Sequence, residues 1–209
     1  MLFLNANPFS LIAPFENFIF SFFMFILLFA SALPLKVVTG SLFRIQSAYS
    51  GNSLGDTHDY RAVSTHLQRE EGSFWVIEPT EQLRYRAPIL CNTSVSLLSS
   101  NHDMYLKITS KGDAVLSKSN LESESEFVLV CKGNQKQLDT DNAFMLLNPK
   151  NNCYLETSIE DTIGGEEDSY MVRCGNLSSK SIWKLSVGVY LDELESEHVN
   201  SATSFSDEL

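Results

Sequence analysis

Three stretches of the chain between Val37 and Val189 repeat one order of short apolar segments. Each stretch begins with a small residue and an apolar segment, at residues 41–45, 94–98 and 143–147. A second apolar segment follows after a polar turn, at residues 54–56, 105–108 and 154–157. Each stretch closes with an aromatic residue before a last segment, namely Trp75, Phe127 and Trp183, which are 52 and 56 residues apart. The chain therefore carries three units of about fifty residues.

The apolar segments themselves have the length and borders of β-strands. They run for four to six residues and are bounded by Gly, Asn, Ser, Asp or Pro, which form turns. No apolar stripe of helical period longer than two turns occurs before Val187. Three units with about four strands each predict an all-β fold, a β-trefoil over residues 37–189, because a single unit cannot bury its own apolar face.

The first 32 residues differ in composition from the rest. They contain nine of the 14 Phe residues and a single charge, Glu16, and the apolar run at 18–30 ends in Ala30-Ser31-Ala32. This pattern predicts a signal peptide, residues 1–32, cleaved after Ala32. The alternative is a transmembrane anchor, for which the run is short, and the protein would be attached to a membrane only if the leader stays uncleaved.

The chain ends in Ser206-Asp207-Glu208-Leu209. This sequence resembles the signals that a retrieval receptor uses to return luminal proteins to the endoplasmic reticulum. A leader and a retrieval signal together predict a soluble protein of the endoplasmic reticulum lumen. The acidic segment before it, within residues 190–209, is predicted either as a solvated tail or as a short helix that packs Tyr190, Leu191 and Leu194 onto the barrel.

Cysteines and asparagines agree with an oxidising lumen. The four cysteines lie in the body, at Cys91, Cys131, Cys153 and Cys174. Three pairings are possible, and we favour Cys91 with Cys131 and Cys153 with Cys174. A zinc site is the alternative, but neither a Cys-x-x-Cys motif nor clustered His accompanies them. Asn92-Thr93-Ser94 and Asn176-Leu177-Ser178 are acceptor sequences for N-glycosylation at Asn92 and Asn176.

Charge limits the classes of partner. The formal net charge is −11 and becomes about −10 without Glu16. Nucleic acid and anionic membrane surfaces require clustered Lys and Arg, so neither is an expected partner.

Two His-Asp pairs, His58-Asp59 and His102-Asp103, are the residues that most invite an acid–base interpretation. Neighbouring side chains on a strand point to opposite faces, and both pairs lie in polar turn segments, so we expect structural turn residues. The sequence contains no phosphate loop, nucleophile elbow or metal-binding motif. We therefore expect a protein that is not an enzyme and that uses no cofactor; an unrecognised luminal hydrolase remains the alternative.

Aromatic residues have two possible roles. Trp75 and Trp183 could stack on sugars, but their place at the end of each unit favours buried anchors of the barrel. The aromatics expected in exposed loops are Tyr49, Tyr60, Tyr85 and Tyr105, which are candidate contacts for peptide or glycan.

Several of these segments together resemble the MIR repeats of the stromal cell-derived factor 2 family. The resemblance is carried by Val37-Val-Thr-Gly-Ser-Leu42, Leu54 with His58-Asp59, Ala87-Pro-Ile-Leu-Cys91 and Ile182-Trp183-Lys184. It covers most of the body in order and architecture. It implies a cleaved signal, three MIR repeats in a β-trefoil and a retrieval terminus. The family's second disulfide would fall on Cys91 and Cys131, and Cys153–Cys174 would be particular to this chain.

The resemblance also implies a function. It predicts a non-catalytic adaptor in protein folding and quality control, associated with the luminal ATP-driven chaperone and its J-domain co-chaperone and holding clients soluble. Because MIR repeats also occur in protein O-mannosyltransferases, the alternative is a glycan-binding module that acts beside O-mannosylation of client proteins.

Overall fold

A computed structural model describes residues 34–57, 59–65, 74–81, 84–119, 123–162 and 169–189. The regular structure in these ranges is twelve β-strands and one turn of 3₁₀-helix, Ser179–Ser181. The strands are β1 Leu42–Ser47, β2 Ser53–Asp56, β3 Ala62–Thr65, β4 Trp75–Pro79, β5 Ser94–Ser99, β6 Met104–Ile108, β7 Ala114–Ser117, β8 Phe127–Cys131, β9 Ala143–Asn148, β10 Cys153–Thr162, β11 Ser169–Gly175 and β12 Trp183–Val189.

Six of these strands close into a ring. β1 pairs with β12 and β4, β5 pairs with β4 and β8, and β9 pairs with β8 and β12. All six pairings are antiparallel, and each strand has a neighbour on both sides. The ring is therefore a barrel in which no strand has an open edge.

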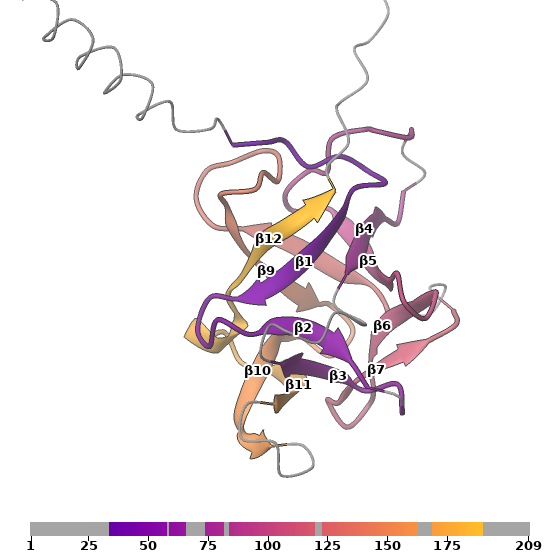
Figure 1. Cartoon of the computed structure of the whole chain (residues 1–209), viewed down its shortest axis with the longest axis vertical. Coiled ribbons are helices and arrows are strands. Elements are labelled where there is room, and N and C mark those ends of the chain that lie inside the picture. Colours follow the sequence, from indigo (N-terminus) through magenta and orange to yellow (C-terminus); the bar gives the residue numbers. More distant parts are fainter. Residues whose placement is uncertain are drawn as a thin grey trace, which may run out of the picture. The chain divides into compact units, whose positions relative to one another are not determined.

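The other six strands form three hairpins that cap one end of the barrel. These hairpins are β2–β3, β6–β7 and β10–β11. β3 pairs with β11, and single bridges join Arg61 to Val115 and Asp113 to Arg173, so each hairpin contacts the other two. In Figure 1 the barrel strands lie above and the cap hairpins below. A six-stranded barrel capped by three hairpins is a β-trefoil, which confirms the predicted fold.

The barrel strands alternate buried and outward residues, as strands with one covered face must. β1 and β9 follow this alternation throughout. The three closing aromatics are fully buried, and so are the aliphatic residues at the related positions Leu54, Leu106 and Leu155. The apolar segments recognised in the sequence thus supply one layer of the core from each repeat.

Three loop segments close the opposite end of the barrel by a cycle of backbone hydrogen bonds. The amide of Val37 donates to Leu138 at 3.0 Å, Leu138 donates to Ile89 at 2.9 Å, and Ile89 donates to Val37 at 3.0 Å. All three side chains are fully buried. Threefold symmetry therefore extends from the cap through the core to the far end of the barrel.

Two disulfides join the cysteines that are nearest in sequence. Cys91–Cys131 and Cys153–Cys174 have Cα–Cα distances of 5.5 and 5.4 Å, within the usual range for a bridge. The first lies at the end of β8 and the second joins β10 to β11. The zinc alternative does not apply, because all four thiols are consumed in these bridges.

Candidate functional site

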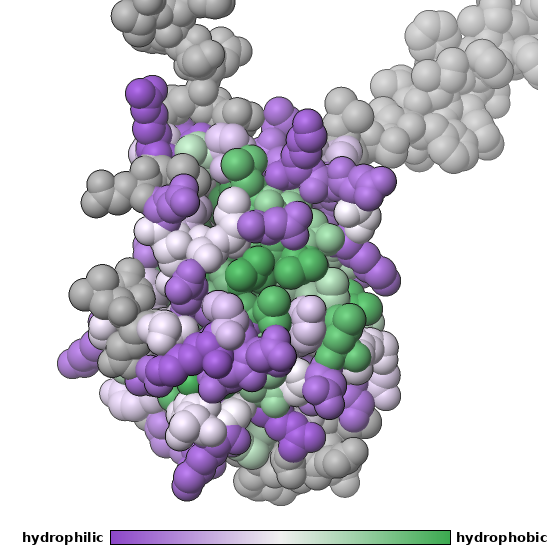
Figure 2. Space-filling model, turned by 180° about the vertical axis from the view of Figure 1, so that it is seen from behind, coloured by the Kyte–Doolittle hydropathy of each residue, from purple (hydrophilic) through white to green (hydrophobic). Residues whose placement is uncertain are grey.

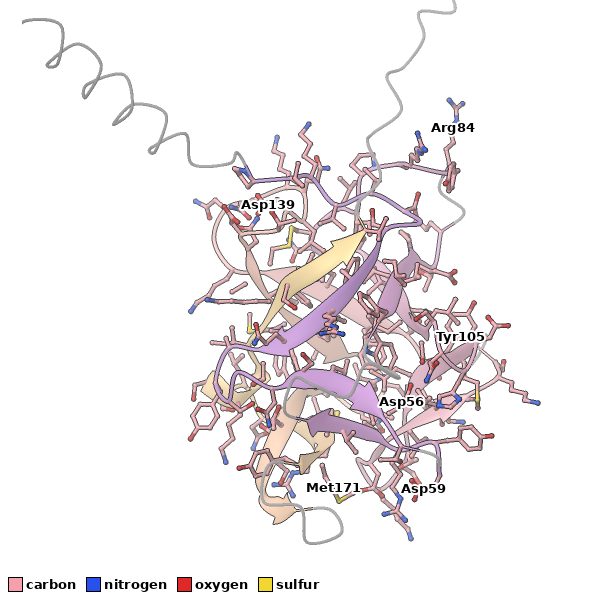
Figure 3. The ribbon with its side chains drawn as sticks, in the orientation of Figure 1. Asp56, Asp59, Arg84, Tyr105, Asp139 and Met171 are labelled. Atoms are coloured by element: carbon pink, nitrogen blue, oxygen red, sulfur yellow. A yellow bond between two sulfur atoms is a disulfide. The ribbon has the colours of Figure 1, made fainter. Side chains whose placement is uncertain are left out.

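Two turns from different repeats lie against each other at the cap. One joins β2 to β3 and the other joins β5 to β6. Together they bring together six residues, which we call the Tyr60 cluster: Asp56, Asp59, Tyr60, Arg61, Ser99 and His102. Figure 3 labels two of these residues, Asp56 and Asp59, and it labels Arg84 and Asp139 at the opposite end of the barrel.

Tyr60 has an unusual backbone conformation. Its φ of 61° is in the left-handed region, which a bulky residue seldom adopts. The next repeat has Gly112 at the related position, with a φ of 88°. The two turns also make equivalent hydrogen bonds to the following repeat. The carbonyl oxygen of Tyr60 accepts from the amide of Leu116, and that of Gly112 accepts from the amide of Cys174, both at 2.7 Å. A conformation suited to glycine is thus occupied by an aromatic residue that is 48% exposed.

Asp56 anchors the inner side of the cluster. Its carboxylate is 2% exposed. It accepts a hydrogen bond from the Ser99 hydroxyl at 2.7 Å, and His102 Nε2 lies 3.2 Å from its other oxygen. The Tyr60 ring meets the His102 ring edge to face, with centroids 5.5 Å apart. Asp56 therefore orients an imidazole whose ring meets an exposed phenol ring edge to face.

The outer side of the cluster carries one charge of each sign. Arg61 Nε lies 3.0 Å from Asp59, and the Thr57 hydroxyl donates to the same carboxylate. The Thr57 hydrogen bond first, and then the charge of Arg61, lower the pKa of Asp59 below its ordinary value. Asp59 is therefore ionised at neutral pH and, with Arg61, presents both an acceptor and donors to solvent.

The geometry suits binding better than nucleophilic catalysis. A serine nucleophile is activated when its hydroxyl donates to an imidazole base. Here Ser99 donates to Asp56 instead, so the carboxylate lies between the hydroxyl and the imidazole. The cluster offers an aromatic face, an oriented imidazole, a carboxylate and a guanidinium to a polar ligand.

In the following repeat, the polar groups around the position related to Ser99 bind one another. Asn148 replaces Ser99 there, and its side-chain amide donates to the carbonyl oxygens of Glu124 and Glu126 at 3.1 and 3.0 Å. Lys107 and Lys150 both pair with the Glu124 carboxylate. No exposed aromatic ring accompanies this group among the described residues, which makes the Tyr60 cluster the better candidate for recognition.

The structure pairs His102 differently from its sequence neighbour. Its partner is Asp56, from the preceding repeat, and not Asp103. Asp103 has a φ of 52° in the turn, in keeping with the structural turn role expected for this pair. Asp59 contacts Thr57 and Arg61, while His58 lies outside the described residues.

The predicted aromatic roles divide into buried and exposed positions. The indoles of Trp75 and Trp183 are fully buried, a position that suits anchors and excludes sugar stacking. Tyr49, Tyr60 and Tyr85 are exposed as expected. The expectation that Tyr105 is an exposed loop residue is wrong. Tyr105 lies in β6 and is half-buried. Its hydroxyl donates a hydrogen bond to the Glu78 carboxylate of β4 at 2.9 Å.

The remaining sequence predictions concern surface positions and segments beyond the described ranges. Asn92 and Asn176 are both exposed, as glycosylation requires. The leader 1–32, the tail 190–209 and the terminal Ser206–Leu209 lie outside the described residues. Within the described ranges, no helix has the length and apolarity to cross a membrane, and no group of three or more His, Cys, Asp or Glu could hold a metal ion.

Sequence reasoning missed Asp56 and Ser99. Ser99 looks like an ordinary strand residue, and Asp56 is the last residue of an apolar segment that predicts only core positions. One signal was present: aligning the three units places Asp56 against Ile108 and Thr157, so a carboxylate stands where the other repeats carry uncharged residues.

Comparison with known proteins shows the fold. Neither a family model nor a curated protein matches the sequence. Solved structures do match at low identity. The SDF2-like protein from Arabidopsis thaliana is 14% identical with a TM-score of 0.69, over 77% of this chain and 100% of that chain.

Two further solved structures are similar. The Saccharomyces cerevisiae protein O-mannosyltransferase Pmt1-Pmt2 complex bound to the sugar donor is 14% identical, with a TM-score of 0.61, over 81% of this chain and 28% of that chain. The designed 3-fold symmetric protein ThreeFoil is 12% identical, with a TM-score of 0.53, over 70% and 98%. The similarity to the SDF2-like protein confirms the resemblance to the stromal cell-derived factor 2 family that the sequence indicates.

Proposed function

We propose that this protein is a non-catalytic β-trefoil adaptor of the endoplasmic reticulum lumen. In this role it assists an ATP-driven chaperone and its J-domain co-chaperone in keeping client proteins soluble. The observation that carries the non-catalytic part is the hydrogen bond from Ser99 to Asp56, which leaves an oriented imidazole beside an exposed ring without an activated nucleophile. We therefore assign the cluster a role in binding a partner.

The choice of compartment and partners rests on other features. Two disulfides support an oxidising compartment. The predicted leader and the predicted retrieval signal favour the endoplasmic reticulum. The sequence resemblance to the stromal cell-derived factor 2 family, together with the shared fold, supports the chaperone and J-domain partners.

Aggregation of a reduced client protein, followed by light scattering with purified components, tests this proposal. We expect the chain to suppress aggregation when chaperone, J-domain co-chaperone and ATP are all present, and to have little effect alone. The double variant Tyr60→Ala with His102→Ala should lose this effect, because it removes the ring pair that the cluster presents.

A control variant is Tyr85→Ala, which removes an exposed tyrosine from a loop outside the Tyr60 cluster. It should behave as the unsubstituted chain. Suppression of aggregation that does not depend on the co-chaperone, or failure of the chain to bind either partner, would contradict the adaptor function.

A second function is favoured by the chemistry of the same cluster. An exposed ring next to an imidazole, a carboxylate and a guanidinium suits the hydroxyl groups and apolar faces of a sugar. Titration calorimetry with mannose oligosaccharides tests this alternative. Binding that Tyr60→Ala abolishes, together with no effect on client aggregation, would replace the adaptor by a glycan-binding module associated with O-mannosylation.

A further inference from the structure

The three strand pairs of the barrel differ in the residues they turn outward. Because the repeats are related by threefold symmetry, each pair offers corresponding cross-strand positions on its outer face. These are Val76–Leu98 and Glu78–Ser96 in β4–β5, Val128–Leu147 and Val130–Met145 in β8–β9, and Lys184–Gln46 in β12–β1, where a bulge between Phe43 and Ile45 interrupts the register. Ser96 is buried although it lies on this side of its strand. Among these five pairs, both pairs of β8–β9 are apolar, whereas β4–β5 has one apolar pair and the pair of β12–β1 is polar.

The outer face of β8–β9 therefore forms a continuous apolar strip. We define the outer strip as Val128, Val130, Ala143, Met145 and Leu147, which alternate along their strands with fully buried residues. On the side of the molecule seen in Figure 2, apolar side chains form a patch that polar side chains surround. The strip lies on an acidic protein of net charge −11.

A partner can reach the strip only by lying on the outer face of β8 and β9, and not by adding a strand to an edge. β8 has β5 and β9 as neighbours, and β9 has β8 and β12, so neither strand has an edge to which a further strand could be added. An extended peptide lying there would bury backbone amides without partners. A helix satisfies its own backbone hydrogen bonds and presents an apolar face, so it suits this surface better.

The size of the strip agrees with one short helix. Strands of this length give a surface about 17 Å long and about 10 Å wide, which is the width of one helix and the length of about three turns. A stable dimer buries about 800 Å² per partner. The strip is several times smaller, and self-association would also bring together two chains of charge −11.

Two lysines border one end of the strip. Lys184 pairs with Ala143 on one side. On the other side the amide of Lys132 donates to the Ala143 carbonyl oxygen at 2.8 Å. Neither ammonium has an ion-pair partner among the described residues. The exposed Asp141 lies two residues before Ala143, so two ammonium groups face one carboxylate at this end of the strip. The end at Ala143 therefore keeps a small positive charge, which attracts the negative end of a helix dipole.

We propose that the outer strip docks a short amphipathic helix of a partner protein. The helix places aliphatic residues of one face on Val130 and Met145. Its carboxyl-terminal end carries acidic residues and lies between Lys132 and Lys184. This surface is separate from the Tyr60 cluster, and the proposal does not depend on the function proposed above.

Fluorescence anisotropy with two labelled helical peptides tests the docking. Both peptides carry leucines at i, i+3, i+4 and i+7. The first ends in glutamates and a free carboxylate, and the second ends in lysines and an amide. We expect the full chain to bind the first peptide about tenfold more tightly than the second, with the preference declining at high salt.

The decisive variant combines Val130→Glu with Met145→Ser, which introduces the residue types of the corresponding Glu78–Ser96 pair of β4–β5. It should weaken binding of the first peptide by about tenfold or more. Lys132→Glu with Lys184→Glu should abolish the preference between the peptides. The matched control Val76→Thr, on β4–β5, should leave both affinities unchanged.

Three outcomes would overturn the proposal. The first is equal affinity of the unsubstituted chain and the Val130→Glu, Met145→Ser variant, provided that urea unfolding shows both folded; Met145→Gln alone serves if the double variant unfolds. The second is a dimer in sedimentation that the double variant dissolves, since the strip would then bind a second copy. The third is tighter peptide binding by a chain ended after Val189, which would assign the strip to the chain's own acidic segment 190–198.

Discussion

The indole Nε1 of Trp183 donates a hydrogen bond to the carbonyl oxygen of Leu155 at 2.9 Å. The same contact joins Trp75 to Leu54 at 2.8 Å in the first repeat. Phe127 occupies the related position of the second repeat and has no such donor. In two of three repeats, therefore, the closing aromatic ties the last barrel strand to the cap hairpin by a buried polar contact.

Replacing Trp183 by Phe should destabilise the protein by about 2–4 kcal/mol. The substitution leaves a buried carbonyl oxygen unpaired and creates a small cavity. Urea unfolding checks this value, and Trp75→Phe should give a similar loss because its contact is equivalent. A loss below about 0.5 kcal/mol in both variants would mean that the hydrogen bonds contribute little.

Tyr60 provides a test of backbone strain. In Tyr60→Ala the residue still has a Cβ in the left-handed region, whereas Tyr60→Gly relieves it. We therefore expect the glycine variant to be more stable than the alanine variant by about 1 kcal/mol, the reverse of the usual order. Thermal unfolding measures the difference, and both variants should lose any binding that needs the ring. Equal stability would mean that the turn relaxes.

Each disulfide should contribute substantially to stability. The paired cysteines are 21 and 40 positions apart, so restriction of the unfolded chain amounts to about 3–4 kcal/mol for either bridge. Paired Cys→Ala variants, one bridge at a time, should lower the free energy of unfolding by about this amount in urea. Reductant should have no further effect when both bridges are removed. An unchanged midpoint in either variant would contradict the pairing.

Tyr105 should make the stability of the protein depend on alkaline pH. Burial first, and then the hydrogen bond to Glu78 and its charge, raise the pKa of Tyr105 from 10.0 to about 12. The folded state thus holds the phenolic proton more tightly than the unfolded chain. This contribution to stability is present below pH 10 and is lost as the pH rises towards 12.

The absorbance of tyrosinate, taken as the difference from Tyr105→Phe, measures this pKa. In Glu78→Gln the pKa of Tyr105 should fall but stay above 10.0, because burial, the largest cause, remains. Matched substitution of the exposed Asp141 to Asn should not move it. A pKa that Glu78→Gln leaves unchanged would show that the carboxylate has no part in the shift.

Much of the fold could be predicted because its signals are local to each repeat. The spacing of Trp75, Phe127 and Trp183, and the short alternating segments before them, reflect which residues each unit must bury. Nearest-neighbour pairing of the cysteines follows for the same reason, since both bridges close within contiguous segments of 21 and 40 residues. One unit cannot cover its own apolar face, so the number of units determines the architecture.

Only the tertiary structure decided which surfaces can recognise a partner. Asp56 and Ser99 are 43 residues apart and meet because hairpins of successive repeats contact each other around the threefold axis. Val130 and Met145 likewise become neighbours only through the register of β8 with β9, which turns both side chains outward. Burial of apolar residues leaves a periodic pattern along the chain, whereas contacts between outward residues depend on barrel closure and leave none.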